Sequence, residues 1–279
     1  MRQPPRAVRP VTLSSRRCAL SGKAVTTGGS FMRAEATGFG AVYYLVEVLK
    51  HEGESIEGKR LAISGFGNVG WGVVKKTAEL GGKVVAIAGP DGYIYDPDGA
   101  VTDEKINYLL EMRASGRDKV QDYADKFGCE FHAGEKPWGL GADKVDIMMP
   151  CATQNDVNMD SAKKIAASGI KYYIEVANMP TTNDALEFLK KQKHMVIAPS
   201  KAVNACGVAV SALEMAQNAE RLYWTAEEVD AKMHQIMANI YHSSVAAAER
   251  YGLGYDLVAG ANIVGFQRVA DAMTAQGIF

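Results

Sequence analysis

The chain has little cysteine, and the few it has are widely spread. Its four cysteines show neither the C-x-x-C nor the Cys/His spacing of a metal site, so we expect no metal. Cysteines this far apart in the sequence do not indicate a disulfide framework. We expect them to be buried free thiols in a reducing compartment, and we therefore expect a cytoplasmic protein. The cysteines are Cys18, Cys129, Cys151 and Cys206.

The chain also lacks an excess of charge of one sign, and it lacks long hydrophobic runs. The net charge is −1, and 47% of the 279 residues are hydrophobic, which is typical of a globular protein with a large core. Proteins that bind nucleic acid through its phosphates carry an excess of Lys and Arg. A membrane-spanning helix needs about 20 consecutive apolar residues. We therefore expect no nucleic-acid partner and no membrane segment.

Acidic residues are missing from the start of the chain, where the first is Glu35. An Arg-rich and Ser-rich start without acids is typical of a transit peptide, but Pro4, Pro5 and Pro10 oppose the amphipathic helix that such signals use. We therefore favour a disordered tail, or a non-native start, for residues 1–20.

A glycine-rich turn between a strand and a helix is the most informative feature of the sequence. Residues 59–64 predict a short buried strand, residues 71–80 a helix and residues 83–88 a second strand. The turn has the G-x-G-x-x-G spacing of a dinucleotide-binding site. It consists of Gly65, Phe66, Gly67, Asn68, Val69 and Gly70.

Each glycine of this turn has a separate task. Gly65 permits the tight turn, Gly67 lets the backbone approach a pyrophosphate, and Gly70 lets the helix pack closely on the strand. The free N–H groups and the dipole of the helix then face the diphosphate. A bare match could be an ordinary glycine-rich turn, but the flanking strands and helix favour a nucleotide site.

The residues after the second strand bear on the choice between NAD and NADP. Asp91 is the first acidic residue there, and its carboxylate could accept a hydrogen bond from the adenosine ribose and would repel a 2′-phosphate. Neither Lys nor Arg lies between Ala86 and Val101 to bind such a phosphate. We therefore predict NAD in preference to NADP. The alternative is that Asp91 and Gly92 form only a turn.

Strands alternate with helices up to residue 200, which predicts an α/β fold: a Rossmann-like, doubly wound, mostly parallel sheet. In such sheets ligands bind beyond the carboxyl ends of the strands, where this sequence is small or polar. Besides the unit above, we predict helices over residues 34–51, from Thr102, and over 159–167 and 183–191, a small hairpin over 93–99, and strands over 145–149, 171–175 and 195–198.

From Lys201 onward the pattern predicts only helices. These cover residues 202–222, a long helix from Thr225 to about Arg250 with Glu228 completing a capping box, and a last helix over residues 257–275. We therefore divide the chain into the tail, a dinucleotide-binding domain over residues 21–200, and a helical segment over residues 201–279 that packs on it.

Several motifs occur in one order along the chain. They are GGS at 28–30, RAEATGFG at 33–40, CATQN at 151–155, ANMPTT at 177–182, PSKAVNA at 199–205, WTAEEVD at 224–230 and GANIVGF at 260–266. From about Ser21 to its C-terminus the chain resembles the hexameric microbial glutamate dehydrogenases of the Glu/Leu/Phe/Val dehydrogenase superfamily. The resemblance implies an NAD(P)-dependent enzyme that acts on L-glutamate and 2-oxoglutarate, and a homo-oligomer.

The resemblance also implies roles for single residues. Thr37 and Asn68 would contact the dinucleotide, and Ala152 and Asn178 would lie near its nicotinamide end. The residues that would help to hold the amino acid are Arg33, Val208 and Ser211. On a helix, Arg33 and Thr37 would share a face and serve substrate and cofactor together. Without the resemblance, Arg33 would be read as a solvated charge and Ser211 as a small packing residue.

The sequence also departs from the family. Family members have an N-terminal substrate domain with a catalytic lysine and a catalytic aspartate, and nothing here resembles it. We therefore expect that domain to be absent and the chain to be truncated, and we name no catalytic residue; Lys201 does not match the catalytic lysine. Two alternatives stay open. The first is an inactive NAD-binding module. The second is a leucine, phenylalanine or valine dehydrogenase, although the long helical C-terminus and Ser211 favour glutamate.

Overall fold

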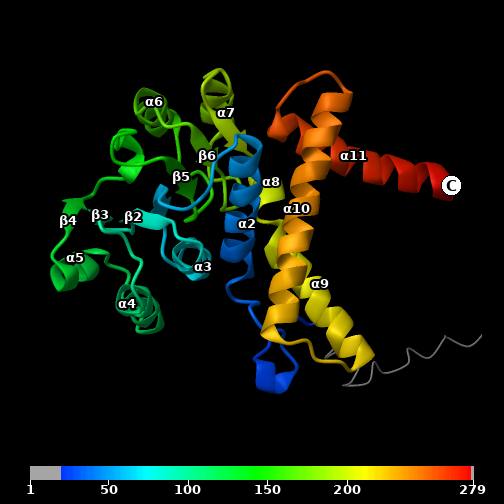
Figure 1. Ribbon diagram of the computed structural model, residues 1–279, viewed down its shortest axis with the longest axis horizontal. Helices are drawn as coiled ribbons and strands as arrows, with labels where there is room; N and C mark the ends of the chain where they lie inside the picture. Colours follow the sequence, from blue (N-terminus) through cyan, green and yellow to red (C-terminus); the bar gives the residue numbers. More distant parts are fainter. Residues whose placement is uncertain (1–19, 278–279) are drawn as a thin grey trace, which may run out of the picture.

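The computed structural model describes residues 20–277, so the predicted tail at residues 1–20 lies, apart from Leu20, outside the described residues. Seven strands form one sheet in the order β4-β3-β2-β1-β5-β6-β7, with helices on both of its faces (Figure 1). Within residues 20–277 no helix combines the length and hydropathy needed to cross a membrane. The strands are β1 (Arg60–Ser64), β2 (Lys83–Ala88), β3 (Gly92–Tyr95), β4 (Glu130–Ala133), β5 (Ile147–Pro150), β6 (Tyr172–Ile174) and β7 (Val196–Ala198).

The helices follow the predicted alternation with the strands and then continue to the end of the described chain. They are η1 (Val25–Thr27), α2 (Ala36–His51), α3 (Asn68–Glu79), α4 (Asp103–Ala114), α5 (Gln121–Phe127), η2 (Pro137–Gly139), α6 (Met159–Ala167), α7 (Asn183–Lys190), α8 (Ser200–Val203), α9 (Ala205–Glu220), α10 (Ala226–Arg250) and α11 (Leu257–Gln276). The predicted caps form, because Thr102 accepts a hydrogen bond at the start of α4 and Thr225 and Glu228 form a complete capping box on α10.

The sheet is doubly wound and mostly parallel, which confirms the predicted fold class. From β1 the chain first adds β2 in parallel on one side and later adds β5, β6 and β7 in parallel on the other. The order of the strands therefore reverses between β1 and β5, the position at which ligands bind in sheets of this type.

The hairpin predicted over residues 93–99 is wrong, because β3 pairs with β2 and β4 and not with a strand that follows the Asp96–Gly99 turn. β3 pairs antiparallel with β2, so the reversal occurs at residues 89–91, and β3 also pairs with the edge strand β4. The Asp96–Gly99 turn leads instead into α4, because the Asp96 carboxylate accepts hydrogen bonds from Lys105 at 2.6 Å and from Tyr123 at 3.0 Å. These bonds direct the chain away from a return strand.

Alternate side chains of the strands supply two separate cores. The side chains on one face pack against α2, α3 and α4, and those on the other face pack against η2, α6 and α7. This period-two alternation of buried residues is expected of a sheet that is covered on both faces. The first side includes Leu61, Ile63, Val84, Ile87, Ile147 and Met149, and the second includes Ala62, Val85, Met148, Tyr173 and Ile197.

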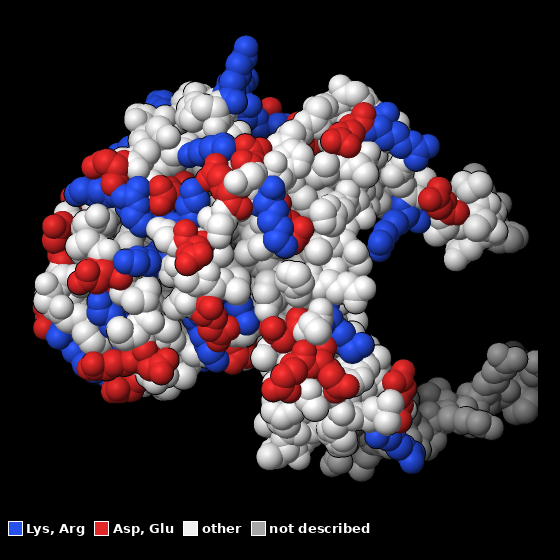
Figure 2. Space-filling view, viewed as in Figure 1, with Lys and Arg blue, Asp and Glu red and all other residues white. Residues whose placement is uncertain are grey.

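The C-terminal helices form a further layer. The buried helix α2 stands between the sheet and α10, and α11 projects away from the body of the molecule (Figure 1). Between α11 and the lower end of α9, the surface has an open concave side (Figure 2). Both helices carry exposed apolar side chains, among them Val208 and Met215 on α9 and Phe266, Val269 and Met273 on α11.

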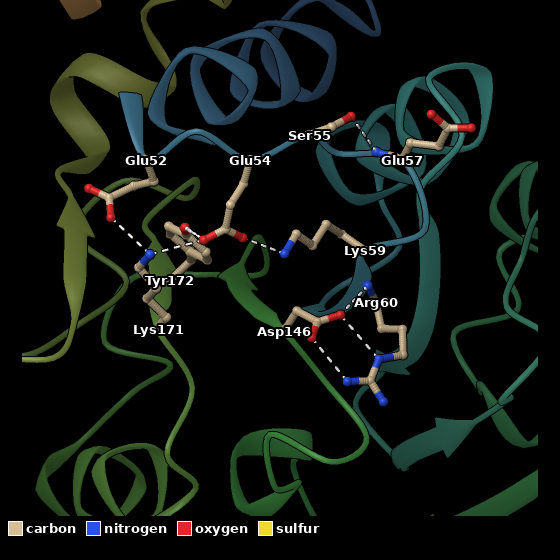
Figure 3. Close-up of polar contacts among 9 residues, drawn as sticks. All are labelled: Glu52, Glu54, Ser55, Glu57, Lys59, Arg60, Asp146, Lys171 and Tyr172. Carbon is tan, nitrogen blue, oxygen red and sulfur yellow. Dashed lines mark hydrogen bonds and ion pairs between the residues drawn. The ribbon is translucent and has the colours of Figure 1, made fainter. Parts of the chain in front are cut away.

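Ion pairs and hydrogen bonds connect charged residues at the amino ends of the central strands (Figure 3). Glu54 accepts hydrogen bonds from Tyr172 at 2.6 Å, from Lys171 at 2.9 Å and from Lys59. Beside them Arg60 pairs with Asp146, with 3.0 Å between Nη2 and Oδ1. The hydrogen bond from Lys59, together with that from Tyr172, lowers the pKa of Glu54 to about 2. The charged side chains of Glu54, Arg60 and Lys171 at this end of the sheet thus have partners within the protein.

Candidate functional site

A cleft runs along the opposite edge of the sheet, at the carboxyl ends of β1 and β5. It consists of two cavities of about 760 Å³ and 580 Å³, which share four lining residues. The larger cavity extends toward α2 and α9, and the smaller follows the glycine turn toward the end of β2. The shared residues are Val69, Cys151, Ala152 and Thr153.

The glycine turn forms one wall of the smaller cavity. Gly65 has a φ of +76°, and a Cβ there would lie 2.8 Å from the Cα of Ala152, so both the turn and the close approach require glycine. A Cβ on Gly70 would lie 2.0 Å from the carbonyl oxygen of Gly65. Gly67 differs, because a Cβ there would meet no atom within 4 Å. The space beside Gly67 is therefore open for a ligand.

The amino end of α3 faces this open space without a protein cap. Gly67 is its N-cap, no side chain accepts its first N–H groups, and its first turn has no acidic residue. Uncapped N–H groups and the positive end of a helix dipole favour an anionic group such as a diphosphate. The turn residues Phe66, Asn68 and Val69 line the same cavity.

The two cavities meet where β1 and β5 end. The Ser64 hydroxyl accepts hydrogen bonds from the backbone N–H of Cys151 at 3.1 Å and of Ala152 at 3.4 Å. Across the larger cavity, the Asn204 side chain donates to the carbonyl of Val176 at 3.0 Å and to Oδ1 of Asn178 at 2.8 Å. Asn204 was not predicted as a site residue, although it lies within the PSKAVNA motif. It holds the predicted residue Asn178 in position.

The far wall of the larger cavity comes from the crossing of α2 and α9. A Cβ on Gly207 would lie 2.3 Å from the Thr37 hydroxyl, so the absence of a side chain lets the two helices approach. Thr37, Val208 and Ser211 all line this cavity. The Ser211 hydroxyl donates to the carbonyl of Gly207 at 3.2 Å.

Arg33 also lines the larger cavity, but not for the reason that the sequence suggested. The helix predicted from residue 34 begins at Ala36, so Arg33 lies in the turn before α2 and does not share a helix face with Thr37. Its Nε is buried and has no hydrogen-bond partner among residues 20–277. A buried donor without a partner is costly, and a ligand carboxylate would satisfy it.

The segment before Arg33 is held on α9 by a buried carboxylate. Glu214 is fully buried; it forms an ion pair with Lys23 at 2.7 Å and accepts a hydrogen bond from the N–H of Gly22 at 2.9 Å. Burial opposes its ionisation, but these partners leave the pKa of Glu214 below its ordinary value. One turn further along α9, Asn218 donates to the carbonyl of Gly28 at 2.7 Å. Glu214 and Asn218 thus position the strap, residues 22–30, that leads to Arg33.

Asp91, the predicted ribose acceptor, does not line either cavity. Its carboxylate accepts hydrogen bonds from the N–H groups of Val120 at 3.0 Å and Gln121 at 3.1 Å, at the start of α5. Gly70 is also absent from the lining, because it packs against the turn itself. The described geometry therefore gives Asp91 a structural partner, which corresponds to the turn that the sequence left as the alternative.

Four charged residues of the smaller cavity were missed in the sequence. Arg113, Asp118, Lys136 and Asp156 line it together with Gly89 and Pro90. Lys136 pairs with Asp156 at 3.3 Å, whereas Nη1 of Arg113 and Oδ2 of Asp156 are buried without partners. No local motif marks these residues, since they come from three separate segments that only the fold brings together.

Titratable groups near the cleft are shifted mainly by burial. Burial raises the pKa of the thiol of Cys151 and raises that of Cys206 to about 12, so both stay protonated at neutral pH. Burial also raises the pKa of Glu175, partly offset by hydrogen bonds from Thr181 and from the N–H of Ser200. Neither thiol is therefore an activated nucleophile.

A Rossmann-like sheet with an uncapped glycine turn and a cleft at its switch point defines the nucleotide-binding domain of a dehydrogenase. Comparison with known proteins narrows this class. The Glutamate/Leucine/Phenylalanine/Valine dehydrogenase family matches residues 28–277, and the chain belongs to that family.

Individual relatives agree with this assignment. The chain is 69% identical to the NAD-specific glutamate dehydrogenase of Clostridium symbiosum over 93% of its own length, and 47% identical to the NADP-specific glutamate dehydrogenase of Escherichia coli over 94%. A solved glutamate dehydrogenase structure matches 94% of the chain with a TM-score of 0.91 and 68% identity. The chain spans 57% of the length of each of these three proteins.

Proposed function

We propose that the chain binds NAD along the cleft and holds an amino acid at the Arg33 end, as part of a glutamate dehydrogenase. The reaction converts L-glutamate, oxidised NAD and water reversibly into 2-oxoglutarate, ammonium, NADH and a proton. The observation that carries the proposal is the continuity of the two cavities at Val69, Cys151, Ala152 and Thr153. One cavity has the features of a diphosphate site and the other an unpaired buried guanidinium nitrogen.

The cofactor part of the proposal rests on the glycine turn and the relatives' names. The open side of Gly67 and the uncapped start of α3 fit a diphosphate, and bound NAD would supply the hydride acceptor. Phe66 and Asn68 would lie along the diphosphate, and Thr37, Ala152 and Asn178 toward the nicotinamide. NAD is favoured over NADP by the 69% identical relative, whose name specifies NAD.

The substrate part of the proposal rests on Arg33, Val208 and Ser211. A guanidinium binds a carboxylate through paired hydrogen bonds, and Arg33 is the one charged residue among those described as lining the larger cavity. Because that lining includes no Lys, Asp or Glu, it supplies no group for the proton transfers of deamination. This favours a second candidate function, in which the chain by itself binds NAD without turnover.

We also propose a homo-oligomer in the cytoplasm. The exposed apolar side chains of Phe266, Val269 and Met273 on α11 support association. The free thiols of Cys129 and Cys151 support a reducing compartment. Light scattering after size exclusion tests the first point, and a monodisperse monomer at high concentration would contradict it.

Two assays on the purified chain separate the candidate functions. Titration of NADH, followed by its fluorescence, tests cofactor binding, and absorbance at the NADH band with glutamate and NAD tests turnover. Binding together with glutamate-dependent reduction supports the dehydrogenase. Binding without turnover leaves the NAD-binding module, and no binding of either NADH or NADPH by the folded chain contradicts both.

A further inference from the structure

A third cavity, of about 410 Å³, lies outside the cleft, between α8, α10 and α11. It shares no lining residue with the two cavities of the cleft. α11 packs closely on α10 at Gly260, where a Cβ would lie 2.0 Å from the carbonyl oxygen of Ser244, and then leaves the body of the molecule (Figure 1). The third cavity lies in the angle between these two helices, and α8 forms its remaining wall.

Most of the wall of the third cavity is aliphatic. Ile236 and Ile240 of α10 and Val264 of α11 line it, and Ala202 and Ala205 line the side toward α8. The three larger side chains are only half-buried, so a ligand with a hydrocarbon part would remove their apolar surface from water. The volume of the cavity lies within the range of roughly 300–1,000 Å³ that is typical of small-molecule sites.

The charged side chains at the third cavity are both cationic. Lys201 of α8 and Arg268 of α11 line it, and its lining among the described residues includes neither Asp nor Glu. Lys201 donates one hydrogen bond, to Oδ1 of Asn262, and has two further donors. Burial raises the pKa of Glu175, and the charge of Lys201 partly offsets that rise. Neither cation forms an ion pair within residues 20–277, so the cavity attracts an anion.

We propose that the third cavity is a binding site for a small aliphatic carboxylate. The hydrocarbon part of the ligand packs on Ile236, Ile240 and Val264, and its carboxylate lies within reach of Lys201 and Arg268. A guanidinium can bind a carboxylate through two parallel hydrogen bonds, which favours this anion over a halide. The ligand is a second one, because the amino acid of the proposed function lies at Arg33 in the cleft.

Isothermal titration calorimetry of the purified chain with hexanoate tests the site. Hexanoate binds because it combines a hydrocarbon chain with a negative charge. Acetate lacks the chain and hexylamine carries the opposite charge, so each binds roughly tenfold more weakly or not at all.

Variants of the chain locate the bound hexanoate. Lys201→Gln and Arg268→Gln each weaken its binding roughly fivefold, because one attractive charge is lost. A Cβ on Gly265, which also lines the cavity, would meet no atom within 4 Å, so Gly265→Leu fills the space without a clash and abolishes binding. Arg250→Gln, which removes a positive charge from the exposed end of α10, is the matched control and leaves the affinity unchanged. Melting temperatures show that each variant is folded.

The outcomes separate this inference from the proposed function, which the NADH titration tests by itself. Failure of the folded chain to bind hexanoate overturns the inference and leaves NAD binding unaffected. An unchanged affinity in both Lys201→Gln and Arg268→Gln also overturns it. Loss of hexanoate in Arg33→Gln, with full binding in Arg268→Gln, would place the ligand in the cleft and likewise contradict the third cavity as its site.

Discussion

At the amino ends of β1, β5 and β6 the sheet carries charges that are paired, whereas the cleft at the carboxyl ends contains buried polar atoms without partners among residues 20–277. Glu54 alone contacts Lys59, Lys171 and Tyr172 at the first edge. At the second edge Nε of Arg33, Nη1 of Arg113 and Oδ2 of Asp156 have none. Unsatisfied buried groups reduce stability, and a ligand bound in the cleft would supply partners for these three atoms.

The largest effect is expected at the carboxyl edge, from a methyl group on the turn. Gly70→Ala would place a Cβ 2.0 Å from the Gly65 carbonyl oxygen. We expect a loss of about 3 kcal/mol in the free energy of unfolding, measured with urea, because backbone must shift to relieve the clash. Gly67→Ala is the matched control and changes stability by less than about 0.5 kcal/mol, yet it weakens NADH roughly tenfold by filling the space of the diphosphate. Equal stability losses in both variants would contradict this division.

The next largest effect concerns the strap, residues 22–30. It tests whether buried ionic contacts stabilise the strap near the cleft, as paired charges stabilise the amino ends of the strands. Glu214→Ala removes the buried partner of Lys23 and of the N–H of Gly22. We expect a loss of about 2–3 kcal/mol in unfolding free energy. Hydrogen exchange of residues 22–30 should become faster, and Glu220→Gln, at the exposed end of the same helix, should behave like the unaltered chain. Unchanged protection of the strap in Glu214→Ala would show that other contacts hold it.

A smaller effect is expected from acid at the amino edge. The pKa of Glu54 is about 2 in the folded chain and 4.5 ordinarily, so its contribution is present above pH 4.5 and is lost as the pH falls from about 4.5 to 2. Because Glu54 and its lysine partners are partly exposed to solvent, we expect Glu54→Gln to lower the free energy of unfolding by only about 1 kcal/mol at neutral pH. The difference from the unaltered chain, measured by urea unfolding, should vanish near pH 2. A difference that is constant with pH would exclude ionisation of Glu54 as its cause.

The smallest effect has the opposite sign and lies at the carboxyl edge. Burial raises the pKa of Glu175 above its ordinary value of 4.5, so its ionisation opposes folding. Its favourable contribution is present below pH 4.5 and is lost as the pH rises through the raised pKa. Glu175→Gln stays neutral and keeps an acceptor for the N–H of Ser200. We expect a slightly higher melting temperature than the unaltered chain at pH 7 and an equal one below pH 4.5. A lower melting temperature at pH 7 would show that the charge is stabilising.

Most of the fold could be predicted because its signals are local. Short apolar runs located β1, β2, β5, β6 and β7, and side-chain caps located the starts of α4 and α10. Strand β4 and helix α5 escaped, since β4 is an edge strand of four residues without a fully buried side chain and α5 has seven residues. Elements this short are determined by their neighbours more than by their own pattern.

The candidate site likewise combines residues that local motifs reveal with residues that only the fold brings together. The glycine turn, Thr37, Asn178 and Arg33 were predicted from contiguous motifs, whereas Val208 and Ser211 were predicted from the family resemblance alone. The structure brings Arg33, Thr37, Asn178, Val208 and Ser211 to one cavity, and their roles stay predictions.

The charged residues of the smaller cavity show the limit, since Arg113, Lys136 and Asp156 line it and lie in none of these motifs. The sequence alone determined the alternation of strands and helices, the uncapped turn and the family pattern, because these depend on neighbours in the chain. Only the tertiary structure decided which charges line the smaller cavity, because Arg113, Lys136 and Asp156 come from segments that are far apart in the chain.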